Sequence, residues 1–303
     1  MGNRYSKIVF EAEEGLELEA FMGTEGQLIV KAIRAVKEET NFQPQYGNLP
    51  IPSGYTHIAG NLKDGFVIER NSDGSQFVWI DVGSLDPDGT LDGENFNQQF
   101  GRRNYTDEEF SYVGYNEIIG EELREQIESV AKYKGFYISR FNISKGPKET
   151  PLSVRGQMPW GNISFDKAKE IAESMEKTAE VKSHLTYGAE YDSVLAWLIK
   201  TENKTLAQIA KNSSSWGNFS DSNSSDMSVA KTGSCEEWCA NNIYDLAGNV
   251  EEFTQEKYGS SFSTIRGGVS YSKGFYEPVA YRNTCDFDIG YQDVGFRVAL
   301  TLE

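Results

Sequence analysis

The stretch NNIYDLAGNVEEFT, residues 241–254, decides the fold that the sequence predicts. Its turn contains Gly248, with Asp245 before it and Glu252 after it. A glycine-containing turn of this kind points alternate backbone carbonyls inward, and the acids at its two ends supply negative charge. From Trp238 onward the chain consists of short strand-like runs separated by glycine turns, and this stretch is the first clear example.

A second informative stretch, RGGVSYSKGFYEPVAYRNTCDFDIGYQDVGFRVAL, covers residues 266–300. The glycines near its two ends, residues 267–268 and Gly295, allow tight turns. We expect Phe296 to bury its ring and Arg297 to hold a carbonyl or carboxylate beneath the loops. Tyrosines, serines, aspartates and a single cysteine stand between these ends. Such residues could form either a catalytic pocket or a recognition surface.

Upstream of these stretches, the chain divides near residue 45. Residues 6–23 alternate as one or two strands do, and GQLIVKAIRAVKEE, residues 26–39, has helical spacing. A segment rich in Pro, Gly and Asn at residues 41–55 is typical of a linker. We therefore expect a small N-terminal element, residues 1–45, followed by one larger domain, residues 46–303.

The larger domain is predicted to mix helices and strands. Amphipathic spacing predicts helices over residues 121–133, 164–177 and 187–202. Strands are expected within residues 54–60, 65–82 and 135–145, with a hairpin turn at 71–75. Trp160 and Trp238 are interpreted as core side chains. Helices in the middle and an irregular, glycine-rich second half predict the α+β class.

Charge and hydropathy restrict the partners. The sequence has 46 acidic and 29 basic residues, a net charge of −17. Such a surface repels phosphate backbones and the sequence contains no basic patch, so nucleic acid is not an expected partner. No apolar run is long enough to span a membrane, and the N-terminus lacks the apolar core of a secretory signal. We expect synthesis in the cytoplasm without a signal peptide, with association with a virion as the open alternative.

Several landmarks, in their order and spacing, resemble the formylglycine-generating-enzyme (sulfatase-modifying factor) family. They are NNIYDLAGNVEEFT, RGG, AYRN and VGFRVAL, preceded by GFYISRFNISK, MPWGNISFDKAKEIAESM and HLTYGAEYDSVLAWLI. The resemblance covers roughly residues 50–303 and leaves the N-terminal stretch unexplained. It implies a C-type lectin-like fold, of the α+β class and with much irregular structure.

The oxidases of that family hold copper with two cysteines between the double glycine and an alanine-x-arginine. The matching interval here, VSYSKGFYEPV, contains no cysteine, and Cys285 lies beyond it, alone. Copper(I) requires soft thiolate ligands, which serine and tyrosine do not supply. We therefore predict no catalytic residues and no copper. An enzyme of the same family with altered chemistry remains the alternative.

Two other metals are also not expected. Iron-dependent sulfoxide synthases of the wider family use a histidine triad, whereas this chain has only His57 and His184. Cys235 and Cys239 are four residues apart, but a zinc site would need further ligands. The sequence therefore predicts neither iron nor zinc, and the thiols are interpreted as reduced structural groups.

Calcium is the metal that the resemblance does imply. By position, the calcium ligands of the family fall on Asp245, Gly248, Val250 and Glu252, the glycine and valine through their backbone carbonyls. Ligands that are all oxygens suit calcium, and two carboxylates add charge. The alternative is that Asp245 and Glu252 only accept hydrogen bonds from turn amides. We expect a structural calcium ion here.

The residues between the scaffold positions form the predicted ligand-binding surface, within residues 269–293. They are Tyr271, Ser272, Phe275, Tyr276, Glu277, Tyr281, Asn283, Thr284, Asp286, Asp288, Tyr291, Gln292 and Asp293. Tyrosine offers a large contact area at little entropic cost, and small polar residues adapt their hydrogen bonds, as in antibody loops.

The lectin-like scaffold with this ending is also similar to the variable proteins of diversity-generating retroelements in phages and bacteria. That resemblance implies a non-catalytic, calcium-stabilised protein that binds a protein or carbohydrate target through its C-terminal surface. It also implies a phage or prophage origin and a receptor-binding role. Residues 1–45 would then form homo-oligomers or attach the domain to a particle.

Overall fold

The computed structural model of the chain describes residues 49–85, 100–103, 105, 115–118, 120–223 and 226–303, and the backbone of 8–12, 16–22 and 28–34. The chain divides into two compact units, residues 1–48 and residues 49–303. Within the described parts, no helix combines the length and the apolar character that a membrane crossing requires.

The described part of the N-terminal unit is a three-stranded antiparallel sheet. Its strands are β1 (Ile8–Ala12), β2 (Leu16–Met22) and β3 (Leu28–Arg34). The helix expected over residues 26–39 is therefore wrong. β3 pairs with β2 along its whole length, from Met22 opposite Leu28 to Leu16 opposite Arg34. Pairing in a hairpin satisfies the backbone, and the β-branched residues of β3 prefer the extended form.

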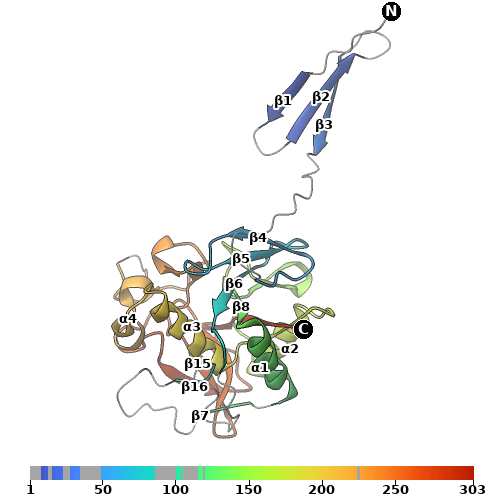
Figure 1. Cartoon of the computed structure of the whole chain (residues 1–303). Helices are drawn as coiled ribbons and strands as arrows, with labels where there is room; N and C mark the ends of the chain where they lie inside the picture. Colours follow the sequence, from blue (N-terminus) through green and yellow to red (C-terminus); the bar gives the residue numbers. More distant parts are fainter. Residues whose placement is uncertain are drawn as a thin grey trace, which may run out of the picture. The chain divides into compact units, whose positions relative to one another are not determined.

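The larger unit is built on a six-stranded sheet with the order β11-β18-β8-β6-β5-β4 (Figure 1). Its strands are β4 (Tyr55–Ala59), β5 (Val67–Arg70), β6 (Gln76–Asp81), β8 (Gly135–Ser139), β11 (Val181–Leu185) and β18 (Val298–Leu302). The hairpin expected at residues 71–75 is confirmed, because the Arg70 amide donates to the Ser75 carbonyl at 2.8 Å. The C-terminal strand β18 lies between β8 and β11, so the end of the chain completes the core.

A second sheet carries the segment that the sequence singled out. Its order is β16-β15-β14-β17, with β7 also paired to β14. The strands are β7 (Tyr115–Glu117), β14 (Glu251–Tyr258), β15 (Phe262–Arg266), β16 (Arg282–Asp286) and β17 (Val294–Phe296). Shorter elements are strands β9 (Ser144–Lys145), β10 (Pro151–Leu152), β12 (Cys239–Ala240) and β13 (Ile243–Tyr244), and 3-10 turns Pro147–Glu149, Ser214–Trp216 and Glu236–Trp238.

The three expected helices are confirmed. They are α1 (Glu121–Tyr133), α2 (Phe165–Ser174) and α3 (Gly188–Lys200), followed by the short α4 (Leu206–Ala210). The N-cap hydroxyl of Ser164 accepts a hydrogen bond from the Lys167 amide, which starts α2. α1 and α2 lie side by side (Figure 1), and Lys169 reaches Glu122 at 3.5 Å between them.

Helix α3 supplies much of the hydrophobic core. Tyr191, Val194, Leu195 and Leu198 are all buried, as the stripe of apolar residues predicts. The helix contacts β6 of one sheet and β14 of the other, and so joins the two. Helices, two main sheets and long irregular connections confirm the α+β class.

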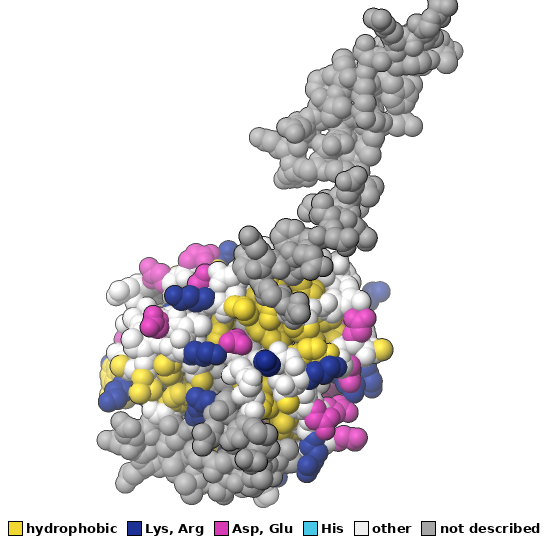
Figure 2. Space-filling model, viewed as in Figure 1, with side chains coloured by type: hydrophobic (Ala, Val, Ile, Leu, Met, Phe, Trp, Pro, Cys, Tyr) yellow, Lys and Arg dark blue, Asp and Glu magenta, His cyan; other side chains and the backbone are white. Residues whose placement is uncertain are grey.

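The surface mixes both signs of charge. Figure 2 shows basic and acidic side chains interspersed on one face, with apolar side chains between them. Several of these charges are paired between elements, as in Lys200 with Asp81 at 2.9 Å and Lys182 with Glu303 at 2.7 Å. Exposed pairs of this kind contribute little to stability, so most of the stability comes from the packed core.

We predict that Leu195→Ala lowers the free energy of unfolding by about 2–5 kcal/mol, because it leaves a cavity in a fully buried site. Urea denaturation of the full chain measures the change. The matched control is Leu206→Ala, the same substitution at a residue that is 54% exposed, for which we expect a change of less than about 0.5 kcal/mol. Equal effects of the two substitutions would contradict this placement of the core.

Candidate functional site

Two arginines that share one carboxylate form the base of the C-terminal surface. Strands β15 and β16 place Arg266 and Arg282 directly opposite each other. The Nη2 atom of Arg266 donates to Oδ1 of Asp192 on α3 at 2.8 Å, and Arg282 donates to Oδ2 of the same side chain. All three side chains are buried. Charge-assisted hydrogen bonds to both oxygens compensate the carboxylate for its loss of water.

A second buried carboxylate, Glu256 on β14, completes this ion cluster. Arg282 Nε lies 3.1 and 3.2 Å from its two oxygens, and Arg266 and Arg102 each approach one of them at 3.4 Å. Burial raises the pKa of Asp192, but the positive charges of Arg282 and Arg266 lower it by more than burial raises it. The net shift is therefore downward. The Asp192 carboxylate is therefore ionised, and the cluster joins α3 to three strands of the second sheet and to the segment of Arg102.

The loop between the two arginines, residues 267–281, is held in place at several points. Gly268 has φ +76, and a Cβ atom there would lie 2.6 Å from the Glu277 carbonyl and 2.7 Å from the Phe219 ring. Only glycine fits this position without a shift of its neighbours. Farther along, the Ser213 amide donates to the Gly274 carbonyl at 3.0 Å, and the Ser220 amide donates to the Ser272 carbonyl at 2.8 Å.

Three aromatic side chains of this loop are exposed to solvent. Tyr271, Phe275 and Tyr276 have exposed fractions of 62%, 44% and 67%. The rings of Phe275 and Tyr276 contact each other with their centroids 4.2 Å apart, and the Lys273 ammonium lies 5.5 and 5.9 Å from them. We call Tyr271, Phe275 and Tyr276 the aromatic group. Exposed aromatic side chains on a fixed loop are typical of binding surfaces.

Acidic side chains lie beside the aromatic group. Glu251 on β14 is 6% exposed, and its Oε1 atom accepts a hydrogen bond from Nδ2 of the Asn283 side chain at 3.0 Å. Burial raises the pKa of Glu251 to about 8, and the charges of Glu277 and Asp293 add to this rise. The Tyr271 hydroxyl donates to Asp293. The structure thus brings Tyr271, Glu277, Asn283 and Asp293 of the predicted set around a residue, Glu251, that the sequence did not single out.

Other members of the predicted set lie elsewhere. Asp286 and Asp288 line a separate cavity of about 540 Å³, together with Phe165 and Lys257. Thr284 and Tyr291 are half-buried, and Ser272 contributes its carbonyl to Ser220. Tyr281 is also half-buried, but it stays near Glu277 and Glu251, whose charges add to the rise that burial causes in its pKa. Gln292 is exposed and lines a third region, the cavity around Trp160.

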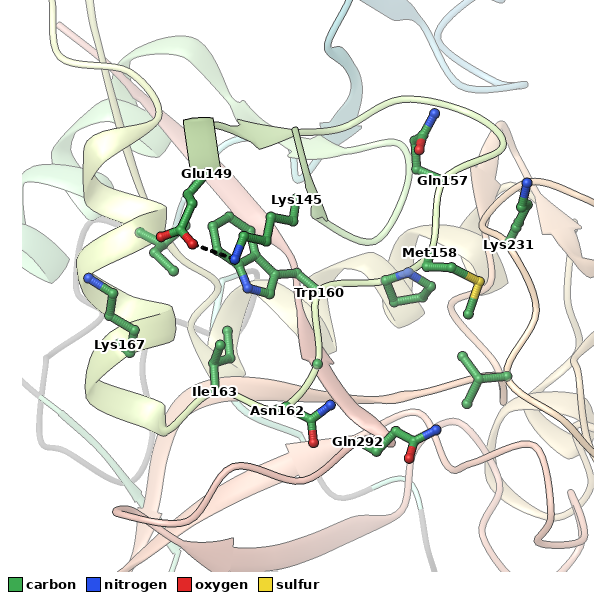
Figure 3. Close-up of a pocket in the computed structure, with 14 residues that line it drawn as sticks. Lys145, Glu149, Gln157, Met158, Trp160, Asn162, Ile163, Lys167, Lys231 and Gln292 are labelled. Carbon is green, nitrogen blue, oxygen red and sulfur yellow. Dashed lines mark hydrogen bonds and ion pairs between the residues drawn. The ribbon is translucent and has the colours of Figure 1, made fainter. Parts of the chain in front are cut away.

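This third region is a cavity of about 660 Å³ (Figure 3). Trp160 lies near its centre, Lys167 at one side on α2, and Lys231 at the opposite side. Its polar lining also includes Lys145, Asn162 and Gln292. Trp160 is only 8% exposed, so its assignment to the interior is right, yet sequence reasoning missed that it lines a cavity. The adjoining Gly-Asn turn at residues 161–162 was the available signal.

The residues expected to bind calcium lie at one buried turn. Asp245 has φ +55, and its Oδ2 atom accepts hydrogen bonds from the Thr232 hydroxyl and the Gly233 amide, each at 2.7 Å. Glu252 accepts from Arg297 Nε and Asn142 Nδ2 at Oε1, each at 2.7 Å. Arg297 therefore holds a carboxylate, as predicted.

Each of the two acids has one carboxylate oxygen that accepts no hydrogen bond. Asp245 Oδ1 and Glu252 Oε2 are buried and have no hydrogen-bond partner in the structure. Burial raises the pKa of Asp245, and it raises that of Glu252 to about 7 against the opposing effect of Arg297. A buried carboxylate oxygen without a donor is costly, so a cation that contacts both atoms would be stabilising here. This observation fits calcium, although Arg297 already neutralises part of the charge.

The Cys285 thiol and the His184 imidazole are both buried. Cys285 is 8% exposed, and burial raises its pKa to about 11. Cys235 and Cys239 lie on either side of a 3-10 turn and form no disulfide. His184 is buried against Glu190 at 3.0 Å. Within the described ranges, no group of three or more His, Cys, Asp or Glu side chains is placed to hold a metal ion.

Comparisons with known proteins agree with the residues that carried the resemblance. A family model described as "Sulfatase-modifying factor enzyme 1-like domain" matches residues 67–302. No curated protein matches the chain.

Several solved structures are similar at low identity. They include Treponema denticola variable protein 1, with 11% identity over 83% of this chain and 100% of that chain and a TM-score of 0.43. PvdO from Pseudomonas aeruginosa has 14% identity over 78% and 98% of the two chains and a TM-score of 0.45. CarF has 15% identity over 56% and 87%, and a TM-score of 0.41. Likenesses of this degree carry no argument about function.

We predict that Asp192→Asn destabilises the protein by about 3–5 kcal/mol, because it leaves two buried guanidinium groups short of a negative charge. Thermal and urea unfolding of the full chain measure the loss. Asp288→Asn is the matched control, since Asp288 is exposed and the chemical change is identical. If both variants unfold like the parent protein, the ion cluster does not have the structural role given to it here.

Proposed function

The chain belongs to the sulfatase-modifying factor enzyme 1-like family and has its C-type lectin-like fold, and from this premise we propose that it is a non-catalytic binding protein. Its target is a protein or a carbohydrate. The binding surface is formed by residues 269–293, with the aromatic group at its centre.

The observation that carries the proposal is the exposure of the aromatic group on a loop held by backbone contacts. Large aromatic side chains lose water on binding and have few rotamers to lose, so they bind at low entropic cost. The fixed backbone of residues 267–281 reduces that cost further, because the loop is already ordered before the target arrives. Glu277 and Asp293 beside the rings would give the surface its polar specificity.

The protonation state of the thiol in this segment argues against a covalent mechanism. Thiolate is the reactive form of cysteine, and a thiol with a pKa of about 11 is almost wholly protonated at neutral pH. The Ser263 hydroxyl lies 3.2 Å from its sulfur, and the negative charges of Glu251 and Asp286 raise the pKa of the thiol further. The altered-enzyme alternative therefore lacks an activated nucleophile at this position.

A calcium ion bound at the buried turn is the second part of the proposal. Asp245 Oδ1 and Glu252 Oε2 would be its side-chain ligands, and the carbonyls of Gly248 and Val250 its backbone ligands. The two partnerless carboxylate oxygens support this assignment. The ion would supply positive charge that fixes the turn between β13 and β14, next to the loop that carries the binding surface.

The third part concerns the N-terminal unit. A three-stranded sheet joined to the binding domain is suited to oligomerisation or to attachment to a phage particle, and we propose one of these roles for residues 1–45. In that case the chain is a receptor-binding or variable protein of a phage or prophage. A reverse transcriptase gene and a near-copy of the codons for residues 269–293 beside the gene would identify active diversification.

We predict that replacing the aromatic group together by alanine (Tyr271→Ala, Phe275→Ala, Tyr276→Ala) weakens target binding at least about a hundredfold, since each such residue contributes about 2 kcal/mol at a binding hot spot. The full chain is immobilised and offered arrays of glycans and of cell-surface proteins, and each partner found is titrated against parent and variant.

The matched control is Ile58→Ala with Leu62→Ala, which removes two apolar side chains of similar exposure, 42% and 40%, at β4 and the turn after it. We expect it to leave target binding unchanged. Binding that survives loss of the aromatic group would show that the surface is wrongly assigned. Turnover of a thiol substrate that requires Cys285 would overturn the non-catalytic proposal.

We predict that calcium stabilises the protein. A ligand at a hundredfold excess over its Kd adds about 2.7 kcal/mol, which for a domain of this size raises Tm by about 5–10 °C. Scanning calorimetry with calcium, with magnesium and with a chelator measures the shift, and magnesium should have a smaller effect because it demands a stricter geometry. Asp245→Asn should reduce the calcium effect. Equal Tm values with calcium and with chelator would refute the site.

A further inference from the structure

The cavity around Trp160 has a composition that the proposed function does not explain. The chain carries a net charge of −17, yet three lysines and one glutamate line this cavity. Its volume of about 660 Å³ is in the range of sites for small ligands. A local excess of positive charge on an acidic protein favours an anionic ligand of limited size, because the negative net charge of the whole protein repels a long polyanion.

The wall that carries Trp160 is fixed before any ligand arrives. The Trp160 amide donates to the Ile143 carbonyl and the Asn162 amide donates to the Tyr291 carbonyl, each at 2.8 Å. A Cβ atom at Gly161 would lie 2.5 Å from the Gln292 carbonyl, so the two loops touch through their backbones. This contact brings Gln292 to the edge of the cavity and makes the indole and the amides a preformed surface.

The lysines of the cavity are available to an anion. Lys145 pairs with Glu149 at 2.5 Å and Lys167 with Glu170 at 2.9 Å, and all four side chains are about half exposed or more. Pairs in such positions contribute little and exchange partners readily. Lys231, on the opposite side in Figure 3, has no ion-pair partner among the described residues. An anion that enters the cavity can therefore pair with Lys231 without displacing a carboxylate.

The amides of the cavity distinguish between classes of anion. Gln157, Asn162 and Gln292 each offer both a donor and an acceptor. A sulfate or a fully ionised phosphate group can only accept hydrogen bonds, so it offers the amide oxygens no donor. Sugar hydroxyls both donate and accept, and the apolar face of a sugar ring can contact an indole. The Lys145 ammonium lies over the Trp160 ring, 5.4 Å from its centroid, so a sugar that contacts the exposed part of the indole also meets a positive charge.

We propose that this cavity binds an acidic saccharide unit, a uronate or a sulfated sugar. Trp160 contacts the sugar ring, the amides bind its hydroxyls, and Lys231 pairs with its carboxylate or sulfate. No member of the aromatic group lines this cavity, although Gln292 belongs to the segment 269–293, and the proposal does not rest on the function proposed for the aromatic group.

A titration with two matched sugars tests the proposal. The full chain is titrated by calorimetry and by tryptophan fluorescence with a glucuronate-terminated disaccharide and with the same disaccharide ending in glucose. We expect the acidic sugar to bind at least about tenfold more tightly, the effect of one charge-assisted contact. Lys231→Glu should abolish this preference without changing affinity for the neutral sugar. Trp160→Phe should remove the fluorescence change.

Three controls make the outcome decisive. Lys211→Glu makes the same charge change at an exposed lysine outside the cavity and should leave both affinities unchanged. The triple alanine variant of the aromatic group should bind the acidic sugar as the parent does. Inorganic sulfate at equal concentration should bind more weakly than the acidic disaccharide.

Several results would overturn the proposal. They are equal affinity for the two sugars, equal effects of Lys231→Glu and Lys211→Glu, loss of sugar binding in the triple variant, and tighter binding of sulfate or of a phosphoserine peptide. Because Lys231 is exposed, its variant tests the site even if Trp160→Phe does not fold.

Discussion

The sharing of Asp192 between Arg266 and Arg282 is the constraint on which the C-terminal surface depends. The two arginines are the residues at which the loop 267–281 leaves β15 and enters β16, so one carboxylate closes the loop at its base. Since Asp192 lies on the core helix α3, the loop is fixed to the centre of the domain rather than to its edge. Removing water from these charges is costly, and contacts among them, with Glu256 and with backbone groups such as the Arg103 amide offset that cost.

Local patterns predicted the elements of the domain but not this cluster. The apolar stripe of α3 and the Asp-Gly turn at residues 73–74 depend on neighbours a few positions apart, and both were predicted. Asp192 lies within the same helix as that stripe, and nothing near it in the sequence indicates that its partners lie at 266 and 282. The error at β3 has the same origin, because its apolar spacing fits a helix until pairing with β2 is known.

The candidate site was likewise predicted only in part, where its features depend on local sequence. The tyrosine-rich composition of residues 269–293 predicted a surface, and the exposed aromatic group lies in it. That Asp286, Asp288 and Gln292 line two other cavities could not be predicted, since a bend in the chain sends consecutive residues to different faces. Nor could the role of Trp160, because burial and the lining of a cavity have the same signature in a sequence.

The contacts that fix the loop are mostly made by its backbone. The Ser272 and Gly274 carbonyls accept from Ser220 and Ser213, and the Val279 amide donates to the Ser213 hydroxyl at 2.9 Å. None of these contacts depends on the side chain of the loop residue involved. The exposed side chains of the loop can therefore change without loss of its conformation, as long as the glycines and the two arginines remain. A surface that must accept different side chains on a constant backbone needs this separation of contacts, which an enzyme pocket does not.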